Sequence, residues 1–332
     1  MNTKFSHCAK YLQDNYPALG PIRDITPMEH NNINSTNYLL TAGDNKYVLR
    51  HFTDGSTPEK IEKICQILIF CLENQANVVQ PVKNKANCYV DRKRKLYLTK
   101  YYEGESCDET NYRTNDGLQD AARNLAILHL ALSRVPIKYN YRGNHSYYQH
   151  PDERELAGVE TVIKHKQDKD EIDEKVLKNL DYLSESFSEN ALLSRSLTRA
   201  NQKKQLIHHD LHPGNVIFNN NRVVAILDFN AMRKGERIED VAFASFRFSH
   251  SEKRNVAEMK KCIKLFVDTY LLYNDIDRPL ACLDYYLIHE ILGRLSFILR
   301  KRYFTGSNVW STDFSKNLGF LKLAREMGPL WA

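Results

Sequence analysis

The sequence predicts an α+β protein with two lobes, a small one built on an antiparallel sheet with one main helix and a larger, mainly helical one. Strand-like segments flank the turn at 43–45 and again the basic turn at 92–95, which is typical of hairpins. Apolar residues recur at helical spacing over 61–72, between those hairpins. Helical patterns predominate further along, so we expect one lobe over residues 1–103 and the other over 104–332.

Length and composition argue against several classes of protein. The chain has 332 residues and a formal net charge of +6, with acidic and basic residues interspersed, which indicates a mildly basic surface rather than a nucleic-acid-binding face. No stretch approaches the roughly 18 apolar residues of a membrane span, and the N-terminal residues lack the apolar core of a signal peptide. Seven cysteines without a C-x-x-C pair are typical of reduced thiols. We therefore expect a cytoplasmic protein, monomeric or homodimeric, that binds neither nucleic acid nor a membrane.

The stretch 206–229 carries the strongest functional signal. It presents His208, Asp210, Asn215 and Asp228 in a loop and at a strand end, within two short apolar strands joined by an Asn-rich turn. Phosphoryl transfer from a metal–nucleotide complex needs such a set, because one Asp handles the hydroxyl proton while an Asn and a second Asp hold magnesium. The spacing also fits the pattern H-x-D-L-x-x-x-N followed by Asp-Phe. The alternative is a polar turn without chemistry.

The segments HHDLHPGNVIF and VVAILDFNAMRKGERIEDVAFASF resemble the catalytic core of the aminoglycoside phosphotransferase and choline kinase superfamily, including its homoserine-kinase-like members. The resemblance covers roughly residues 30–300 and implies a bilobal, protein-kinase-like fold with ATP and Mg²⁺ between the lobes. It implies that Asp210 orients the acceptor hydroxyl and takes its proton, that His208 supports the loop, and that Asn215 and Asp228 hold Mg²⁺.

Three further positions of this motif bear on the kind of kinase. Asp240 falls on a second acidic position of the family, where we expect it to brace the catalytic loop more than to touch the substrate. His209 stands where protein kinases usually carry Arg, and Asn230 replaces the Gly of D-F-G. Both departures, with the missing Gly-rich loop and A-P-E segment, weigh against a protein kinase. His129, on an apolar helical stripe, is expected to be an interhelical histidine.

The resemblance also implies a nucleotide site in the first lobe. Arg50 stands where protein kinases have the lysine of V-A-I-K, and Glu62 is the expected helix acid beside it, with Glu59 and Glu73 as alternatives. Backbone groups of the linker between the lobes would bind adenine, and a polar loop before a strand would cover the phosphates. These expected nucleotide contacts are Lys100 and Tyr102 in the linker and Asn34, Ser35 and Thr36 in the loop.

The sequence gives least about the acceptor, a small molecule with a hydroxyl group. The motifs favour an amino alcohol or hydroxy amino acid, such as choline or homoserine, with an aminoglycoside or sugar as the alternative. Acidic side chains would receive an amine, and aromatic rings would receive a quaternary ammonium. The candidates are Asp240, Glu236, Glu239, Asp284, Glu290, Tyr285, Tyr286 and Trp310.

One rival hypothesis comes from another class, a catalytically inactive nucleotide-binding scaffold. The intact Asp210, Asn215 and Asp228 weigh against it, because loss of activity usually shows first at those positions. The sequence therefore favours an ATP-dependent small-molecule kinase.

Overall fold

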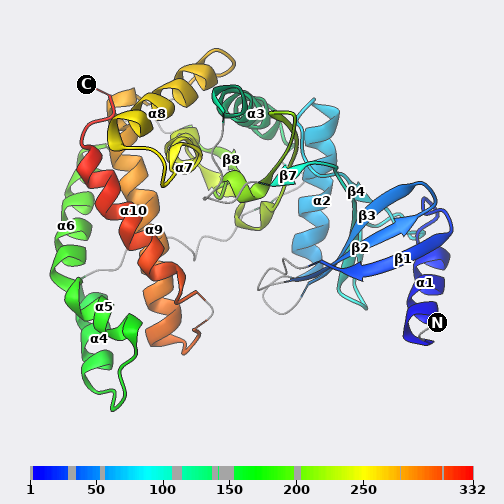
Figure 1. Ribbon diagram of the computed structural model, residues 1–332, viewed down its shortest axis with the longest axis horizontal. Helices are drawn as coiled ribbons and strands as arrows, with labels where there is room; N and C mark the ends of the chain where they lie inside the picture. The colour runs from blue at the N-terminus through cyan, green and yellow to red at the C-terminus, as the bar shows by residue number, and fades with distance from the viewer. Residues whose placement is uncertain are drawn as a thin grey trace.

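The computed structural model has a small sheet lobe and a larger helical lobe (Figure 1), as predicted from the sequence. The structure describes residues 3–28, 35–52, 57–106, 114–136, 141, 153–197, 203–276, 278–308 and 310–331. The expected α+β class is confirmed. The boundary proposed between residues 103 and 104 stays a prediction.

The sheet of the first lobe is antiparallel throughout. Its strands follow the order β1-β2-β3-β6-β4, with β5 pairing β6. They are β1 (Ile22–Pro27), β2 (Ser35–Ala42), β3 (Asn45–Phe52), β4 (Pro81–Val82), β5 (Val90–Asp91) and β6 (Leu96–Lys100). Ala42 pairs directly with Asn45 across a two-residue turn, and Gly43 there takes a left-handed φ of 58° that favours glycine.

Two helices cover the sheet lobe. Leu12 of α1 (Thr3–Asn15) and Tyr16, directly after that helix, join one apolar core with alternate residues of β2 and β3. On the other side lies α2 (Pro58–Glu73), which begins where the Thr57 side chain accepts the N–H of Lys60. Because side chains alternate along a strand, Arg50 and Phe52 share a face of β3, and Phe52 packs in the core that includes α2.

The helical lobe surrounds two small sheets that hold the loops of interest. A sheet of order β10-β9-β7 lies beside the pair β11-β8. These strands are β7 (Glu105–Ser106), β8 (Gln205–Ile207), β9 (Val216–Asn219), β10 (Arg222–Ile226) and β11 (Arg233–Gly235). The helices are α3 (Asn115–Ser133), α4 (Glu153–Lys164), α5 (Glu171–Lys178), α6 (Leu180–Leu197), α7 (Arg237–Ser249), α8 (Val256–Leu271), α9 (Leu283–Phe304) and α10 (Asp313–Met327).

The two lobes meet where β10 ends. The N–H of Val79 donates to the Ile226 carbonyl, and the N–H of Ile226 donates to the Asn77 carbonyl. The strand that leads to Asp228 is therefore fixed to the first lobe by backbone hydrogen bonds. Figure 1 shows α7, α9 and α10 on the opposite side of β8 from the sheet lobe. Among the described helices, none has the length and apolar character needed to cross a membrane.

Candidate active site

The predicted catalytic loop connects β8 to β9. His208 to Asp210 follow β8 directly, and a single 3-10 turn, Pro213–Asn215, leads into β9. The ring of His212 accepts the N–H of Gly214, and the N–H of Asn215 donates to the His212 carbonyl. The loop is thus held by its own hydrogen bonds as well as by its strands.

Asp240, near the start of α7, anchors the first residues of the loop. Its two carboxylate oxygens accept the backbone N–H groups of His208 (2.7 Å) and His209 (2.6 Å). His129 of α3 lies 3.0 Å from the same carboxylate, and its other ring nitrogen lies 2.8 Å from the hydroxyl of Tyr270 on α8. Burial alone would raise the pKa of Asp240, but the contact with His129 and the nearby histidines hold it below its ordinary value.

Two expectations are decided by this arrangement. Asp240 is 2% exposed and braces the loop. Its carboxylate is therefore not open to an acceptor, and the prediction that placed it among the acceptor residues is corrected. His129 is fully buried and links three helices, as expected of an interhelical histidine. The anchored amide of His209 also helps hold a left-handed φ of 69°, which is uncommon for a residue with a side chain.

The ring of His208 connects the catalytic loop to the segment that follows β10 and carries Asp228. Its Nε2–H donates to the Leu227 carbonyl (2.9 Å), and its Nδ1 accepts the N–H of Asp210 (3.2 Å). This pair of bonds fits one neutral tautomer, with the proton on Nε2. The edge of the Phe229 ring packs against the imidazole with 4.6 Å between ring centres. His208 therefore lies where a support for the loop is expected.

Asp210, Asn215 and Asp228 lie together between the strand pairs. The Asn215 side-chain amide donates to the Asp210 carbonyl (2.9 Å), and the Leu227 N–H donates to the Asn215 carbonyl (2.8 Å). Asp228, with a left-handed φ of 55°, follows Leu227 and accepts the N–H of Asn230. Asn215 precedes β9 and Asp228 follows β10, its partner strand. An amide oxygen and a carboxylate are ligands that Mg²⁺ accepts, so the residues fit the expected ion.

Two cations of the first lobe lie near Asp228. Arg50 and Asp228 line the same small cavity between the lobes. Burial opposes the charge of Arg50, but Tyr97 and Asp228 raise its pKa. Lys60, one turn into α2, donates to the Asn230 carbonyl (3.1 Å), and burial lowers its pKa despite the attraction of Asp228. The sequence reasoning missed Lys60, although it lies only two residues before Glu62.

Glu62 has different partners from those expected. Its carboxylate accepts the backbone N–H groups of Tyr89 and Val90, each at 3.0 Å. It therefore holds β5 against α2, and its expected pairing with Arg50 is corrected. The residues around Glu62 could not predict this role, because the role depends on where β5 passes α2.

The other expected nucleotide residues lie in strands β2 and β6 and in the linker that follows β6. The N–H of Lys100 donates to the Gln80 carbonyl, and the hydroxyl of Tyr102 lies 3.4 Å from the Val78 carbonyl. In β2, the backbones of Ser35 and Thr36 pair with β3. Asn34 lies outside the described residues.

The expected acceptor residues are engaged in packing. The Glu236 carboxylate forms an ion pair with Arg278 (2.7 Å) and accepts the hydroxyl of Tyr286 (2.9 Å), and all three side chains are buried. Trp310 packs edge to face against Phe297 of α9. Glu236 and Tyr286 are therefore corrected as acceptor contacts, because their polar atoms already satisfy one another.

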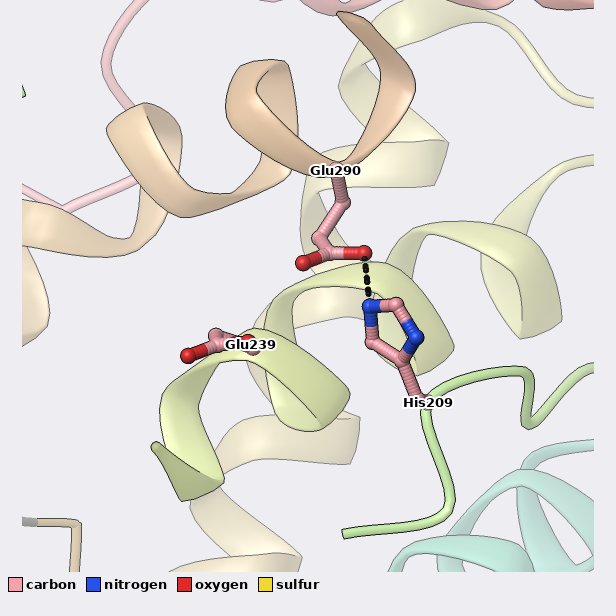
Figure 2. Close-up of side chains that lie close together, drawn as sticks. All are labelled: His209, Glu239 and Glu290. Carbon is pink, nitrogen blue, oxygen red and sulfur yellow. Dashed lines mark ion pairs between the residues drawn. The ribbon is translucent and has the colours of Figure 1, made fainter. Parts of the chain in front are cut away.

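A buried cluster lies behind the catalytic loop. Figure 2 shows the Glu290 carboxylate of α9 pointing at the ring of His209, 2.9 Å away, with Glu239 of α7 nearby. Such a set can bind a metal, but the Arg233 guanidinium contacts Glu239, lies 2.8 Å from the His209 ring and 3.4 Å from Glu290. Arg233 is therefore the cation of this cluster.

The two carboxylates of this cluster differ in basicity. Burial raises the pKa of Glu239 to about 7. The Glu290 carboxylate adds to this increase, and the Arg233 guanidinium opposes it. Burial would also raise the pKa of Glu290, but His209, Arg233 and Arg294 hold it well below its ordinary value.

Arg294 of α9 connects this cluster to Asp210. Its guanidinium donates to Glu290 (3.0 Å), to the His209 carbonyl (3.0 Å) and to Oδ1 of Asp210 (3.3 Å). The sequence reasoning did not single it out. Its signal was the i,i+4 spacing of Glu290 and Arg294, which is common on helices and says nothing about which loop the pair meets.

Comparisons with known proteins agree with this architecture. The model of the phosphotransferase enzyme family matches residues 24–261, so the chain belongs to that family. The resemblance found in the motifs is thereby confirmed, and so is the expected enzyme class, a small-molecule phosphotransferase. None of the curated proteins matches the chain.

Solved structures share the fold at low sequence identity. A spectinomycin phosphotransferase in complex with ADP and spectinomycin has a TM-score of 0.68 and 15% identity, over 97% of this chain and 94% of that one. An amicoumacin kinase in complex with AMP-PNP, Ca²⁺ and Ami has a TM-score of 0.67 and 14% identity, over 99% of this chain and 95% of that one. Choline kinase from Streptococcus pneumoniae has a TM-score of 0.59 and 15% identity, over 96% of this chain and 99% of that one. These likenesses confirm the predicted kinase-like fold.

Proposed function

We propose that this protein transfers the γ-phosphoryl group of ATP to a hydroxyl of a small molecule, an amino alcohol or hydroxy amino acid. The observation that carries the proposal is the connection of three groups. Asn215 holds Asp210 by its side-chain amide, and the His208 ring bonds both to Asp210 and to the residue before Asp228. A carboxylate that can accept the hydroxyl proton and two oxygen ligands for a metal are thus fixed relative to one another.

The roles of the residues follow from their positions. Asp210 orients the acceptor hydroxyl and accepts its proton late in transfer. The His208 ring holds the backbone N–H of Asp210, and Asp240 holds those of the two residues before it. Asn215 and Asp228 would bind Mg²⁺, which neutralises phosphate charge when it is present. Arg50 and Lys60, near Asp228, would contact the phosphate oxygens, and backbone groups around Lys100 and Tyr102 would bind adenine. The complexes of related folds with ADP and AMP-PNP support this nucleotide assignment.

A second acceptor class, an aminoglycoside-type antibiotic, is favoured by the likeness to the spectinomycin phosphotransferase. A cytoplasmic location fits the free thiols of the six described cysteines, and a monomer or homodimer is still the expected assembly.

ADP release from ATP–Mg²⁺ in the presence of amino alcohols, hydroxy amino acids, sugars and aminoglycosides tests the proposal. Asp210→Asn should lower kcat by about 10²- to 10⁴-fold with one acceptor class, because the proton acceptor is lost. It should still bind ATP. The matched control is Asp268→Asn, since Asp268 is an exposed partner of Lys264 on α8. Equal turnover in Asp210→Asn, or a wild type that binds ATP and stays inactive with every acceptor, would contradict the proposal.

A further inference from the structure

A cavity separate from the catalytic loop lies at the junction of the two lobes. Its volume is about 620 Å³, and small-molecule sites usually have roughly 300–1,000 Å³. It is lined by α3, by the segment 74–77 that follows α2, and by the start of β10 (Figure 1). Asp210, Asn215 and Asp228 do not line it. The cavity therefore offers room for a second ligand, outside the proposed catalytic site.

One face of α3 gives this cavity an apolar surface between two cations. Arg123, Ile127, Leu130 and Arg134 all line the cavity, and their spacing of four, three and four residues places them on one side of the helix. Ile127 and Leu130 are only partly buried, and the two arginines are exposed about three turns apart. Such a surface suits a ligand that has an apolar body and an anionic group.

The three cations of the cavity have different partners. Arg222 of β10 donates to the Asp120 carboxylate at 3.0 Å, and the Arg123 guanidinium lies over the ring of Tyr273, 5.5 Å from its centre. Arg134 has neither an ion pair nor a ring contact among the described residues. The cavity is thus lined by three guanidinium groups and one carboxylate, and this excess of positive charge favours an anion over an amine.

Asn77 connects the cavity to the segment that carries Asp228. Its side-chain amide donates to Oδ1 of Asn124 (2.9 Å) and to the Val223 carbonyl (3.1 Å). Its backbone carbonyl accepts the N–H of Ile226 (2.8 Å), two residues before Asp228. A ligand in the cavity therefore contacts residues of both lobes, next to the hydrogen bonds that join the sheet lobe to β10.

We propose that this cavity is a regulatory site for a small amphiphilic anion, a carboxylate or phosphate on an apolar body, whose binding changes the affinity of the protein for nucleotide. The apolar body packs on Ile127 and Leu130, and the anionic group meets Arg134. The regulatory effect rests on the proposed function, because it takes Asp228 as part of the nucleotide site. Binding in the cavity does not depend on that function.

Two fluorescent probes test the site. 8-Anilinonaphthalene-1-sulfonate and N-phenyl-1-naphthylamine share an aromatic body and differ by the sulfonate. With ADP–Mg²⁺ present to fill the nucleotide site, we expect the sulfonate probe to bind about tenfold more tightly, as one charged contact allows. Phenyl phosphate or benzoate should displace it and phenol should not, and the better competitor identifies the anion as phosphate or carboxylate.

Variants of α3 and of the residue after it assign the binding to this cavity. Arg134→Glu should weaken binding of the sulfonate probe at least about tenfold and leave the uncharged probe unchanged, and Arg134→Lys should keep most of the affinity. Leu130→Asp should weaken both probes. Arg23→Glu is the matched control, since Arg23 is exposed on β1 and faces Asp44. Thermal unfolding of each variant checks that the fold is retained.

Equal binding of the two probes, equal binding of the sulfonate probe to wild type and Arg134→Glu, or displacement by neither anion would overturn the site.

Calorimetric titration of ADP–Mg²⁺ with and without the sulfonate probe tests the regulation. The probe should change the Kd for ADP at least about fivefold, and ADP should change the affinity for the probe by the same factor. The effect should disappear in Arg134→Glu, and one that persists there would come from the nucleotide site itself and would overturn the proposal. Probe binding that leaves the Kd for ADP unchanged would also overturn the regulatory role. A wild type that binds the probe at this site and not ADP would contradict the proposed function instead.

Discussion

The two sides of the catalytic loop are built differently. On the side of α3 and α8, Asp240, His129 and Tyr270 form a buried chain of hydrogen bonds that ends on backbone amides. On the side of α9 and α10, Arg294 contacts the side chain of Asp210 itself. The first side fixes where the loop lies, and the second sets the charge that Asp210 meets. Stability and catalysis should therefore respond separately to changes on the two sides.

Asp240→Asn should have the largest effect on stability. The amide keeps one acceptor oxygen, but its NH₂ group then faces either a backbone N–H or His129, and the charge is lost. Loss of charged hydrogen bonds in a buried place should lower the free energy of unfolding by about 2–4 kcal/mol. Urea denaturation measures this value. Asp268→Asn, an exposed partner of Lys264, should cost below about 0.5 kcal/mol.

The pH dependence of that difference tests its electrostatic origin. The folded pKa of Asp240 lies below its ordinary value of 3.8. Its stabilising contribution is therefore fully present above pH 3.8 and is lost as the pH falls through the lower folded pKa. The gap between wild type and Asp240→Asn should narrow below about pH 4. A gap that is constant with pH would mean that packing, and not the carboxylate charge, holds the loop.

Arg294→Gln should affect catalysis more than stability. Glu290 keeps His209 and Arg233 as partners, so the free energy of unfolding should fall by only about 1 kcal/mol. Asp210 loses a contact that orients its carboxylate, and kcat should fall about 10- to 100-fold with a smaller change in KM for ATP. Steady-state kinetics measure both constants. Arg294→Lys should restore part of kcat.

A control on the same helix separates positioning from a general loss of packing. Arg300 of α9 pairs with Glu155 of α4 at 2.7 Å, so its ion pair does not involve the catalytic loop. Arg300→Gln should leave kcat within about twofold of the wild type. Equal losses of kcat in both variants would show that Arg294 acts through the helix, and the contrast between the two sides of the loop would fail.

The sequence was sufficient for features that depend on local spacing. The β-hairpins and the strand–loop–strand around Asp210 are each encoded within a few residues. The bracing role of Asp240 and the interhelical place of His129 also agree with the structure. In these cases a residue type and its periodicity already restrict the partners it can meet.

Features that depend on packing between distant elements could not be predicted. Glu62 could be placed on α2, but its partners Tyr89 and Val90 depend on the path of β5. Glu236 was a candidate to contact the acceptor, whereas Arg278, 42 residues away, pairs with it in the interior. Many side chains of α9 are chemically suited to contact the loop. The rotation of α9 about its own axis against α7 decides which of them does so. A single sequence does not show that rotation.

Glu239→Gln tests whether the charge on the α9 side of the loop changes near neutral pH. In the folded protein the pKa of Glu239 is raised to about 7, from an ordinary 4.5, chiefly by burial. The folded state then holds a proton that the unfolded state has released. That contribution to stability is present below pH 4.5 and is lost as the pH rises through about 7.

Between pH 5 and 7 the free energy of unfolding of the wild type should therefore fall by up to about 1 kcal/mol per pH unit more than that of Glu239→Gln. Urea denaturation across this range measures the two slopes. Glu171→Gln serves as the control, because Glu171 is exposed beside Lys175 and should leave the slope unchanged. Parallel slopes in wild type and Glu239→Gln would mean that Arg233 keeps Glu239 ionised. The α9 side of the loop would then be held by fixed ion pairs, and its charge would not change near neutral pH.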